Sequence, residues 1–338
     1  MGYKVAVVGA TGNVGREMLD ILAERNFPAD EVIAVASRRS QGVECSFGDK
    51  TLKVKAIDHF DFSDVDICLM SAGGAVSKEW SPKIAAQGAV VIDNSSAFRM
   101  DVDVPLVIPE INPEDIRRHR GMIANPNCTT AVALMALHPL HSAFGLRRVF
   151  ASSYQAVSGS GSRAIEELKQ QVEATVGGGQ AVARVYPHPI AFNVLPHVDS
   201  FLDTGYTREE MKMQNEGRKI MHLPDFRASV TCVRVPVYRA HSVAISAEFE
   251  RPVSLEAARA ALAKASGLDL IDEPLSDRYP TPLAAAGKDN CQVGRLRLDC
   301  ALENGLGLWV SGDQLLKGAA LNAVQIAQLL VERSALAA

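Results

Sequence analysis

Cys128 is the residue whose place in the sequence most clearly favours chemistry. A strand-like run ends at Asn125-Pro126, and a strongly helical apolar run begins after the cysteine. A thiol at a helix N-terminus lies beside free N–H groups and the positive end of the helix dipole, which lower its pKa. Most free cysteines are small buried apolar residues, but the polar neighbours Asn127 and Thr129 argue against that alternative. We therefore predict that Cys128 is a nucleophile.

Two further side chains that can do chemistry lie on strand-like runs in the second half of the chain. Arg234 lies within an alternating run, and His241 begins the next apolar run. An unpaired buried charge is expensive, so Arg234 must have a ligand or a fixed partner. Glu216 and Lys219 share one face of a charged helix predicted from about 208 to 222. Such pairs are usually surface salt bridges of little stabilising value.

The cysteines give no sign of a metal site or a disulfide framework. Six cysteines in 338 residues form no C-x-x-C pair and have no zinc spacing, so we expect no metal. Cys68, Cys232 and Cys300 lie in strand-like runs where burial accounts for them, whereas Cys45 and Cys291 are expected in polar loops. The sequence also starts with a strand-like run rather than a signal peptide. We expect reduced thiols and a cytoplasmic location.

A glycine-rich turn follows the first strand-like run, 3–9, and precedes a helix-like run. Its pattern is G-x-x-G-x-x-G, which lets the backbone approach a pyrophosphate while the helix N-terminus binds the negative charge. A tight turn without a ligand would need one glycine rather than three. We therefore predict that a dinucleotide binds here. The binding residues predicted in this turn are Gly9, Thr11, Gly12, Asn13 and Val14.

The end of the second strand-like run, 31–37, distinguishes NAD from NADP in such a fold. An Asp or Glu there would bind the ribose 2′-hydroxyl of NAD, but the sequence has Ser37-Arg38-Arg39-Ser40. Guanidinium and hydroxyl groups suit a 2′-phosphate. A solvated basic loop is the alternative. The missing acid favours NADP(H), bound by Ser37, Arg39 and Ser40.

Strand-like and helix-like runs continue to alternate, which predicts a Rossmann-type parallel sheet. The next strand-like runs are 65–72, 89–94 and 106–108. Small polar loops follow the first two, and loops at the carboxyl edge of such a sheet bind ligands. The cofactor-binding residues predicted in these loops are Ser71, Ala72, Gly73 and Asn94. Arg99 follows the second loop and could bind an anion or face water.

The fold class predicted from these patterns is α/β, with a parallel-sheet dinucleotide-binding domain and a second, α+β domain built on a mixed sheet. The chain is longer than single hydrophobic cores usually grow. The last helix-like run, 315–332, has a wide apolar face and is expected to pack on the first domain. We expect the first domain to comprise 1–128 and 314–338, and the second to comprise 129–313.

Composition excludes several classes of function. The formal net charge is −4 and no basic block is present, so neither nucleic acid nor an anionic membrane is an expected partner. No apolar run is long enough to span a bilayer. The hydrophobic fraction of 47% and charged fraction of 22% are typical of a globular protein. A small-molecule substrate is the expected partner.

Several motifs together resemble those of aspartate-semialdehyde dehydrogenases. The resemblance covers nearly the whole chain, and the number, order and spacing of the motifs make it specific. The motifs are Gly9-Ala10-Thr11-Gly12-Asn13-Val14-Gly15, Asn125-Pro126-Asn127-Cys128-Thr129-Thr130, Tyr154-Gln155-Ala156-Val157-Ser158-Gly159, Arg234-Val235-Pro236-Val237 with His241, and Lys317-Gly318-Ala319-Ala320.

The resemblance implies a role for each of these side chains. Cys128 would be the nucleophile, His241 the acid/base, and Gln155 would orient the substrate acyl group. Arg234 would hold the substrate carboxylate, with Glu216 nearby. The residues implied to bind phosphate or other parts of the substrate are Arg99, Asn127, Ser158 and Lys219. Those implied to contact the cofactor, beside the ones above, are Gly159 and Gln314.

The implied reaction is the NADPH-dependent reduction of β-aspartyl phosphate to aspartate semialdehyde, with release of inorganic phosphate. The Cys128 thiolate would attack the acyl phosphate, and the resulting thioester would accept a hydride before collapsing to the aldehyde with proton help from His241. The product would serve the synthesis of lysine and diaminopimelate, threonine and methionine. A homodimer formed through the second, catalytic and dimerisation domain is also implied.

Two positions depart from the family pattern. Gln314 stands where Asn is common, and Gly217 stands where Thr is usual, which should soften the helix. An N-acetyl-glutamyl-phosphate reductase is the nearest enzymatic alternative, but its cysteine motif is typically Pro-Gly-Cys-Tyr. A non-catalytic dinucleotide-binding protein is the other alternative, and it would be expected to lose Cys128 or His241.

Overall fold

The computed structural model describes residues 2–333 and divides the chain into two compact units. The first unit contains the described residues up to Asn127 and those from Ala319 onward, and the second runs from Cys128 to Gly318. Relative to the expected domain limits, the first boundary falls before Cys128 rather than after it. The second falls after Gly318 rather than after 313. The expected domain also included residue 1 and residues 334–338, which lie outside the described residues.

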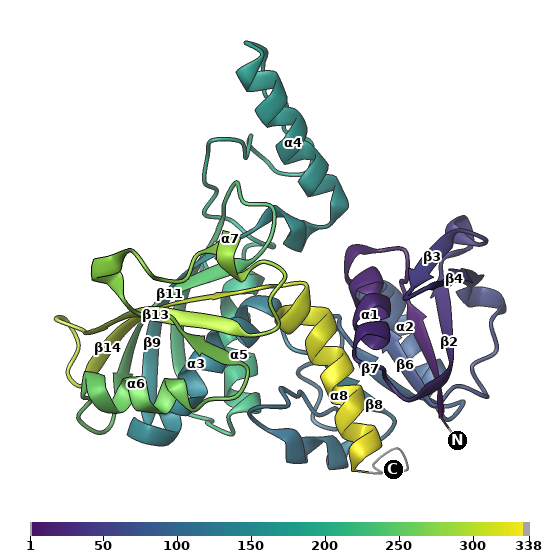
Figure 1. Ribbon diagram of the computed structural model, residues 1–338, viewed down its shortest axis with the longest axis horizontal. Coiled ribbons are helices and arrows are strands. Elements are labelled where there is room, and N and C mark those ends of the chain that lie inside the picture. The colour runs from purple at the N-terminus through teal and green to yellow at the C-terminus, as the bar shows by residue number, and fades with distance from the viewer. Residues whose placement is uncertain (1, 334–338) are drawn as a thin grey trace. The chain divides into compact units, whose positions relative to one another are not determined.

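The first unit contains a parallel sheet with the strand order β5-β2-β1-β6-β7-β8 (Figure 1). Its strands are β1 (Tyr3–Val8), β2 (Ala29–Ala36), β5 (Lys55–Ala56), β6 (Ile67–Met70), β7 (Val90–Asp93) and β8 (Met122–Ala124). The chain runs outward from β1 to β2 and then returns to β6 on the other side of β1. This reversal creates a switch point at the carboxyl edge of β1 and β6, which is where parallel α/β sheets bind their ligands. The predicted Rossmann-type sheet is confirmed.

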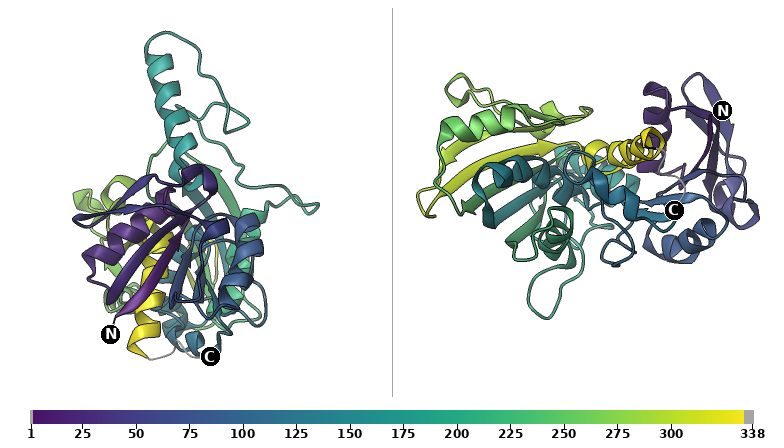
Figure 2. Two further views of the ribbon diagram at one scale, coloured as in Figure 1. Left: turned by 90° about the vertical axis from the view of Figure 1, so that its right-hand side faces the viewer. Right: turned by 90° about the horizontal axis from the view of Figure 1, so that it is seen from below.

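Helices cover both faces of this sheet (Figure 2). They are α1 (Asn13–Glu24), α2 (Gly74–Ala85) and α8 (Leu321–Glu332). Alternate strand residues such as Ala6, Val8 and Met70 pack with Ile84 of α2 in one buried cluster. On the other face α1 and α8 pack against each other, and α8 also contacts β6 and β7. The last helix therefore belongs to the first unit.

The second unit contains a mixed sheet with the strand order β10-β9-β11-β14-β13-β12. Its strands are β9 (Leu146–Gln155), β10 (Arg227–Arg234), β11 (His241–Phe249), β12 (Leu268–Leu270), β13 (Cys291–Leu298) and β14 (Gly305–Gly312). The two outer pairs are parallel and the inner pairs are antiparallel. The predicted mixed sheet is therefore confirmed.

The helices of the second unit differ in what they cover. They are α3 (Cys128–Phe144), α4 (Ser162–Val176), α5 (Arg208–Ile220), α6 (Leu255–Ala263) and α7 (Pro282–Ala285). Helix α3 lies against β9, β11 and β14, with α5 and α6 beside it. Helix α4 projects away from the sheet (Figures 1 and 2). Its inner end packs through Ala164 and Leu168 against Val157 and Ile190.

Short elements complete the described structure. They are the hairpin β3 (Glu44–Phe47) and β4 (Lys50–Lys53), the 3₁₀ turns Arg38–Ser40, Ile57–His59, Pro113–Arg118, Val157–Ser160 and Pro274–Ser276, and the π-helical turn Leu316–Ala320. None of the helices in the described part of the chain has the length and hydrophobicity needed to cross a bilayer.

Some local predictions were wrong. The run 106–108 forms no strand, and Leu106 makes only an isolated bridge to Ala124. Cys45 lies buried in β3 and Cys291 lies buried at the start of β13, although polar neighbours predicted loops. Cys300 is exposed, because β13 ends at Leu298 before the chain turns. These errors concern short runs and strand ends, where tertiary pairing rather than local pattern decides whether a residue joins a strand.

Candidate active site

Cys128 is the first residue of α3, as its sequence position predicted. Its side chain is half-buried, whereas Cys68 and Cys232 are buried. Burial raises the pKa of Cys232 to about 12 and that of Cys68 further still, so both stay protonated thiols. The first turn of α3 carries no acidic residue that would oppose a thiolate at its N-terminus. Among these thiols, Cys128 has the position suited to a nucleophile.

Gly318 allows the π-helical turn to pass directly beside the cysteine. A Cβ atom on Gly318 would lie 2.8 Å from Cβ of Cys128 and 3.1 Å from its Cα. Real Cβ atoms do not approach other carbon atoms so closely, so any other residue would push the turn away from α3. The glycine of the Lys317-Gly318 motif thus serves the packing around the thiol.

Gln155, the last residue of β9, is tied to the start of α3. Its Nε2 donates to Oγ1 of Thr129, the neighbour of Cys128, over 2.5 Å. The same nitrogen donates to Oε1 of Glu209 over 3.0 Å. Since a carboxylate only accepts, the amide nitrogen must face Glu209. The amide oxygen of Gln155 then points elsewhere.

Ala156 connects Arg234 with His241 through its backbone. Its N–H donates to Nδ1 of His241 over 3.0 Å, and its carbonyl accepts from Nη1 of Arg234 over 2.7 Å. The position of Arg234 follows from the parallel register of β10 with β9, which pairs it with Gln155. A Cβ on Gly159 would lie 3.1 Å from Nη1 of Arg234 and 3.2 Å from Nε2 of His241. Gly159, predicted to contact the cofactor, therefore lies against these two side chains.

The surroundings of His241 keep its imidazole neutral. Complete burial, and then the positive charge of Arg234, lower its pKa to about 3 from an ordinary value of 6.5, although the carboxylate of Glu209 opposes them. Because Nδ1 accepts the N–H of Ala156, the proton of the neutral ring lies on Nε2. His241 therefore carries a donor at Nε2.

Three polar atoms of this cluster are buried and have no hydrogen-bond partner among the described residues. They are Oε1 of Gln155, Nε of Arg234 and Nε2 of His241. Buried polar groups are normally paired. One acceptor and two donors gathered in this way are what a small polar ligand would satisfy.

Gln314 is held at both ends of its amide within the second unit. Its Nε2 donates to Oγ of Ser158 over 2.5 Å, and its Oε1 accepts the N–H of Ala240 over 2.7 Å. Ala240 has a φ of 71°, which is unfavourable for a residue other than glycine. Gln314 thus helps to hold the strained residue that precedes His241. Its predicted contact with a cofactor, like that of Ser158 with substrate, stays a prediction.

Glu216 and Lys219 lie on α5, which packs against β10. Glu216 is buried and Lys219 is half-buried. Gly217 between them is also buried, and a Cβ there would lie 2.9 Å from the ring of Phe226. Packing against Phe226 therefore accounts for glycine in place of threonine at this position, although glycine has the lower helix propensity.

The glycine turn of the first unit has the close backbone approaches that its sequence predicted. Gly9 has a φ of 88°, and a Cβ on it would lie 2.2 Å from the carbonyl oxygen of Ser71. A Cβ on Gly15 would lie 2.2 Å from the carbonyl oxygen of Gly9. Helix α1 starts at Asn13, its Ncap Gly12 has no side-chain cap, and its first turn carries no acidic residue. The turn therefore suits a pyrophosphate.

The two arginines of the basic loop after β2 differ in their contacts. Arg38 forms an ion pair with Asp58 at 3.0 Å and contacts Nε2 of His59 at 2.6 Å. Arg39 is exposed and has no ion pair or hydrogen bond among the described residues. Arg39, with Ser37 and Ser40, is the part of the loop that suits a 2′-phosphate.

A hydrogen-bond network fixes Arg99 in the first unit. Its Nε donates to the carbonyl of Asn125 over 2.8 Å, and its Nη2 donates to that of Asn94 over 3.0 Å. The side chains of Asn125 and Asn94 also bond to each other, and Asn322 of α8 donates to Asn125. Arg99 is buried, so it does not simply face water. Asn127 is buried as well.

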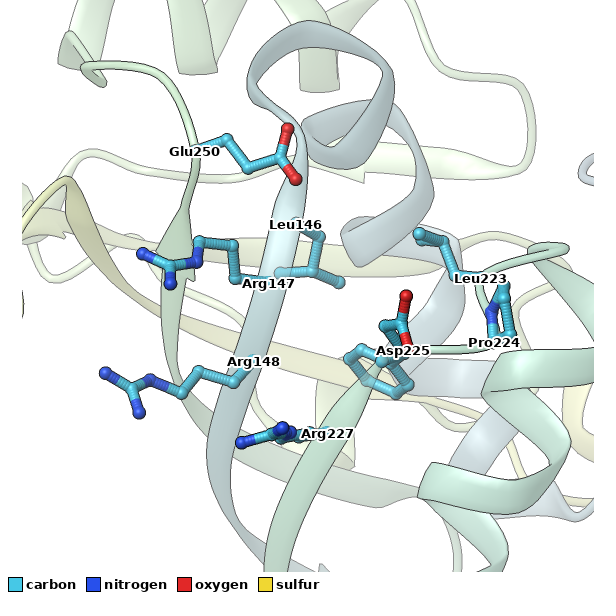
Figure 3. Close-up of a pocket in the computed structure, with 9 residues that line it drawn as sticks. Leu146, Arg147, Arg148, Leu223, Pro224, Asp225, Arg227 and Glu250 are labelled. Atoms are coloured by element: carbon cyan, nitrogen blue, oxygen red, sulfur yellow. The ribbon is translucent and has the colours of Figure 1, made fainter.

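A cavity of about 310 Å³ lies elsewhere on the second unit, at the starts of β9 and β10 (Figure 3). It is lined by Leu146, Arg147, Arg148, Leu223, Pro224, Asp225, Phe226, Arg227 and Glu250. None of these is a predicted site residue, and Arg147 and Arg148 pair with Glu248. The cavity is therefore distinct from the cluster around His241.

Two family models match the chain. One is described as the NAD binding domain of semialdehyde dehydrogenases and matches residues 4–119. The other is described as the dimerisation domain of semialdehyde dehydrogenases and matches residues 137–317. An aspartate-semialdehyde dehydrogenase of Aquifex aeolicus is 53% identical over 336 residues, which cover 98% of this chain and 99% of the relative. This chain belongs to the aspartate-semialdehyde dehydrogenase family.

Other relatives agree with this assignment. An aspartate-semialdehyde dehydrogenase of Synechocystis is 49% identical, and the alignment covers 98% of each chain. The crystal structure of an aspartate semialdehyde dehydrogenase II of Vibrio cholerae complexed with ASA has a TM-score of 0.96 and 45% identity. It covers 98% of this chain and 99% of that one. As an aspartate-semialdehyde dehydrogenase the chain is an oxidoreductase of amino-acid biosynthesis with a nicotinamide-dinucleotide-binding domain.

Sequence reasoning missed three residues of the cluster. Ala156 acts through its backbone, which no side-chain pattern reveals. Glu209 resembles the other charges in the first turn of α5, and its hydrogen bond with Gln155 is what distinguishes it. Thr129 was noted as a polar neighbour of Cys128, but its bond to Gln155 depends on how β9 packs against α3.

Proposed function

We propose that this chain reduces β-aspartyl phosphate to aspartate semialdehyde with NADPH, through a thioester on Cys128. The observation that supports this proposal most is the continuous set of contacts from α3 to the imidazole. Thr129 beside the thiol bonds to Gln155, and the next residue, Ala156, bonds to both Arg234 and His241. A nucleophile, a cation and a proton donor are thereby held by adjacent residues of one strand end.

Arg234 is the proposed contact of the substrate carboxylate. One of its nitrogens is used by the carbonyl of Ala156, and Nε lacks a partner among the described residues. The guanidinium can therefore still donate to an anion. For the phosphate of the substrate we propose Arg99, Asn127 and Lys219, and we propose that Glu216 lies near the substrate carboxylate held by Arg234. Two anionic groups on one substrate require separate cationic contacts.

Catalysis would begin with attack of the Cys128 thiolate on the acyl carbon. The C–O bond to phosphate breaks, phosphate leaves with the electron pair, and a thioester forms. When bound, NADPH would supply the hydride that reduces the thioester carbon. We propose that Nε2–H of His241, which has no partner among the described residues, donates to the hemithioacetal oxyanion that results. The oxyanion then re-forms the carbonyl, the C–S bond breaks, and the thiolate is regenerated.

NADP(H) is the proposed cofactor. The glycine turn from Gly9 to Val14 suits the pyrophosphate, and Ser71, Ala72, Gly73 and Asn94 follow β6 and β7 at the carboxyl edge of the sheet. The exposed Arg39, which lies between Arg38 and Ser40, supports the phosphate-bearing form over NAD. Helix α2 starts beside this edge at Gly74 without a side-chain cap.

A homodimer and a cytoplasmic location complete the proposal. The second unit matches a family model described as a dimerisation domain. One face of its sheet carries Phe150, 47% exposed, in a shallow depression with Ser152 and Thr231. The described cysteines are all free thiols, as a reducing compartment requires. The product would supply the lysine and diaminopimelate, threonine and methionine branches.

The deciding assay is phosphate-dependent reduction of NADP by aspartate semialdehyde, which runs the reaction backwards. The rate should be saturable in phosphate and absent without it, since phosphate must take the acyl group from Cys128. An N-acetyl-glutamyl semialdehyde should not replace the substrate. Reduction of NADP without phosphate, or none with it, would contradict the proposal.

A further inference from the structure

Glu209 occupies an unusual place for a carboxylate in the first turn of a helix. Thr207 caps α5, and Glu209 and Glu210 follow it. Acidic residues there are usually solvated and favoured by the helix dipole. Glu209 is instead only 8% exposed. A buried charge must be compensated by specific partners.

The partners of Glu209 keep it ionised. Its Oε2 accepts from Nζ of Lys212 over 2.8 Å, and Lys212 also contacts Asp199 over 3.1 Å. Burial alone would lower the pKa of Lys212, but the two carboxylates outweigh burial and raise it. The lysine therefore stays a cation, and Glu209 stays a carboxylate.

The other carboxylate oxygen is directed at the candidate site. Oε1 of Glu209 accepts from Nε2 of Gln155, which also donates to Thr129 beside Cys128. An ionised carboxylate cannot donate, so only one of the two orientations of the Gln155 amide satisfies it. The oxygen of that amide is one of the three buried atoms without a partner among the described residues.

We infer that Glu209 is a positioning residue that fixes the side-chain amide of Gln155 in one orientation. The inference rests on the proposed function only in so far as Gln155 contacts the substrate. Lys212 supplies the countercharge, and Thr129 supplies the second acceptor. Glu209 thereby decides whether Gln155 presents an acceptor or a donor to a bound substrate. Removing the charge would leave both orientations accessible.

The test is a double-mutant cycle with Glu209→Gln and Gln155→Ala. A glutamine at 209 can accept or donate, so the Gln155 amide loses its fixed orientation. The single variant should lose roughly 10- to 100-fold in kcat, the value of one charge-assisted hydrogen bond, with the KM for NADP unchanged. In the Gln155→Ala background the same change should have little further effect. Additive losses, or a near-normal kcat, would overturn the inference.

Glu210→Gln is the matched control. Glu210 is equally buried, but it accepts the backbone N–H groups of Thr207 and Cys232 and does not contact Gln155. Its variant should lower the melting temperature and show no coupling to Gln155→Ala. If Glu209→Gln does not fold because Lys212 loses its countercharge, the variant that also carries Lys212→Met removes that cation. The double variant with Glu209→Gln and Lys212→Met should recover its stability, but its kcat should stay low.

A second measurement needs no turnover. The side-chain amide NMR signal of Gln155, identified by its loss in Gln155→Ala, should move in Glu209→Gln and stay in place in Glu210→Gln. An unmoved signal in Glu209→Gln contradicts the inference even if the enzyme is active. If the Gln155 signal moves in Glu209→Gln as expected but the wild-type enzyme is inactive, the result contradicts the proposed function and leaves the inference about Glu209 intact.

Discussion

The backbone N–H of Ala156 donates to Nδ1 of His241 over 3.0 Å. This bond decides which nitrogen of the neutral ring carries the proton, and the proton lies on Nε2. The carbonyl of Ala156 meanwhile holds Arg234. A residue with no functional side chain thus sets the tautomer of one proposed catalytic group and the direction of another.

Replacing His241 by Gln should make the protein less sensitive to acid. The folded-state pKa of His241 is about 3, against 6.5 ordinarily. As pH falls from 6.5 toward 3, the unfolded chain binds a proton that the native protein does not. Native stability therefore falls through that window and levels off below it. The melting temperature of His241→Gln should decline less between pH 7 and pH 4 than that of the wild type.

The same variant should lose roughly 10²- to 10⁴-fold in kcat, as expected for removal of a proton donor. His188→Gln is the control, because His188 is an exposed histidine outside the cluster. His188→Gln should leave kcat and the pH dependence of the melting temperature near those of the wild type. If the melting temperatures of His241→Gln and the wild type declined equally with falling pH, the native protein would protonate His241 over the same pH range as the unfolded chain does.

Replacing Cys128 by Ala should abolish turnover and leave NADP binding and the melting temperature nearly unchanged. The thiol is half-buried at the start of α3, so its loss leaves little empty space. Mass spectrometry of the wild type treated with substrate analogue should find the acyl group on Cys128. Cys300→Ala is the matched control, since Cys300 is also free but lies exposed after β13. Measurable turnover by Cys128→Ala would contradict the thioester mechanism.

Local signals in the sequence predicted the elements that carry the site. The strand, glycine turn and helix around Gly9 follow from apolar periodicity and from backbone positions that tolerate no Cβ. The start of α3 at Cys128 follows from the end of the strand-like run at Asn125-Pro126, because proline disfavours helix in the residue before it. Function at both places depends on backbone geometry encoded within a few residues.

The arrangement around His241 could not be predicted in the same way. Arg234 lies opposite Gln155 because β10 pairs in parallel with β9, a register set by packing across the whole sheet. Glu209 joins the cluster because α5 lies against β10. Cys291, predicted in a loop, lies in a strand because β12 and β14 pair on either side of it. Long-range pairing has no local signature in one sequence.

Replacing Arg39 by Ala should weaken NADP selectively. Loss of one charge-assisted hydrogen bond to the 2′-phosphate should raise the KM for NADP roughly 10- to 100-fold and leave that for NAD unchanged. Arg38→Ala is the matched control, because its guanidinium already pairs with Asp58. Steady-state kinetics with both cofactors provide the comparison. Equal losses for NADP and NAD would show that the loop does not bind the 2′-phosphate.

Replacing Gln314 by Asn distinguishes a cofactor contact from a role in holding Ala240. The shorter amide cannot reach Ser158 and the N–H of Ala240 at once, so the strained backbone before His241 should relax. We expect kcat to fall about 10-fold, the loss of one buried hydrogen bond, while the KM for NADP changes little. A raised KM for NADP with unchanged kcat would instead support the predicted cofactor contact.

Arg234→Lys tests which substrate the site selects. Arg234 is 5% exposed and forms no ion pair with a carboxylate among the described residues, so Glu216 is not its structural partner. A buried cation without an anion is costly. A substrate carboxylate would relieve that cost through two parallel N–H bonds, which an ammonium cannot form. Lysine keeps the charge and loses the planar pair.

The lysine variant should lose roughly 100-fold or more in kcat/KM for aspartate semialdehyde, since two charge-assisted bonds are weakened. Because a remote contact also positions the reacting carbon against Cys128, kcat should fall as well as KM rise. The melting temperature and the KM for NADP should stay near wild-type values. The opposite result, a lower melting temperature with near-normal kinetics, would assign Arg234 to the bond with Ala156 and the contact with the Tyr186 ring. The substrate carboxylate would then bind another cation.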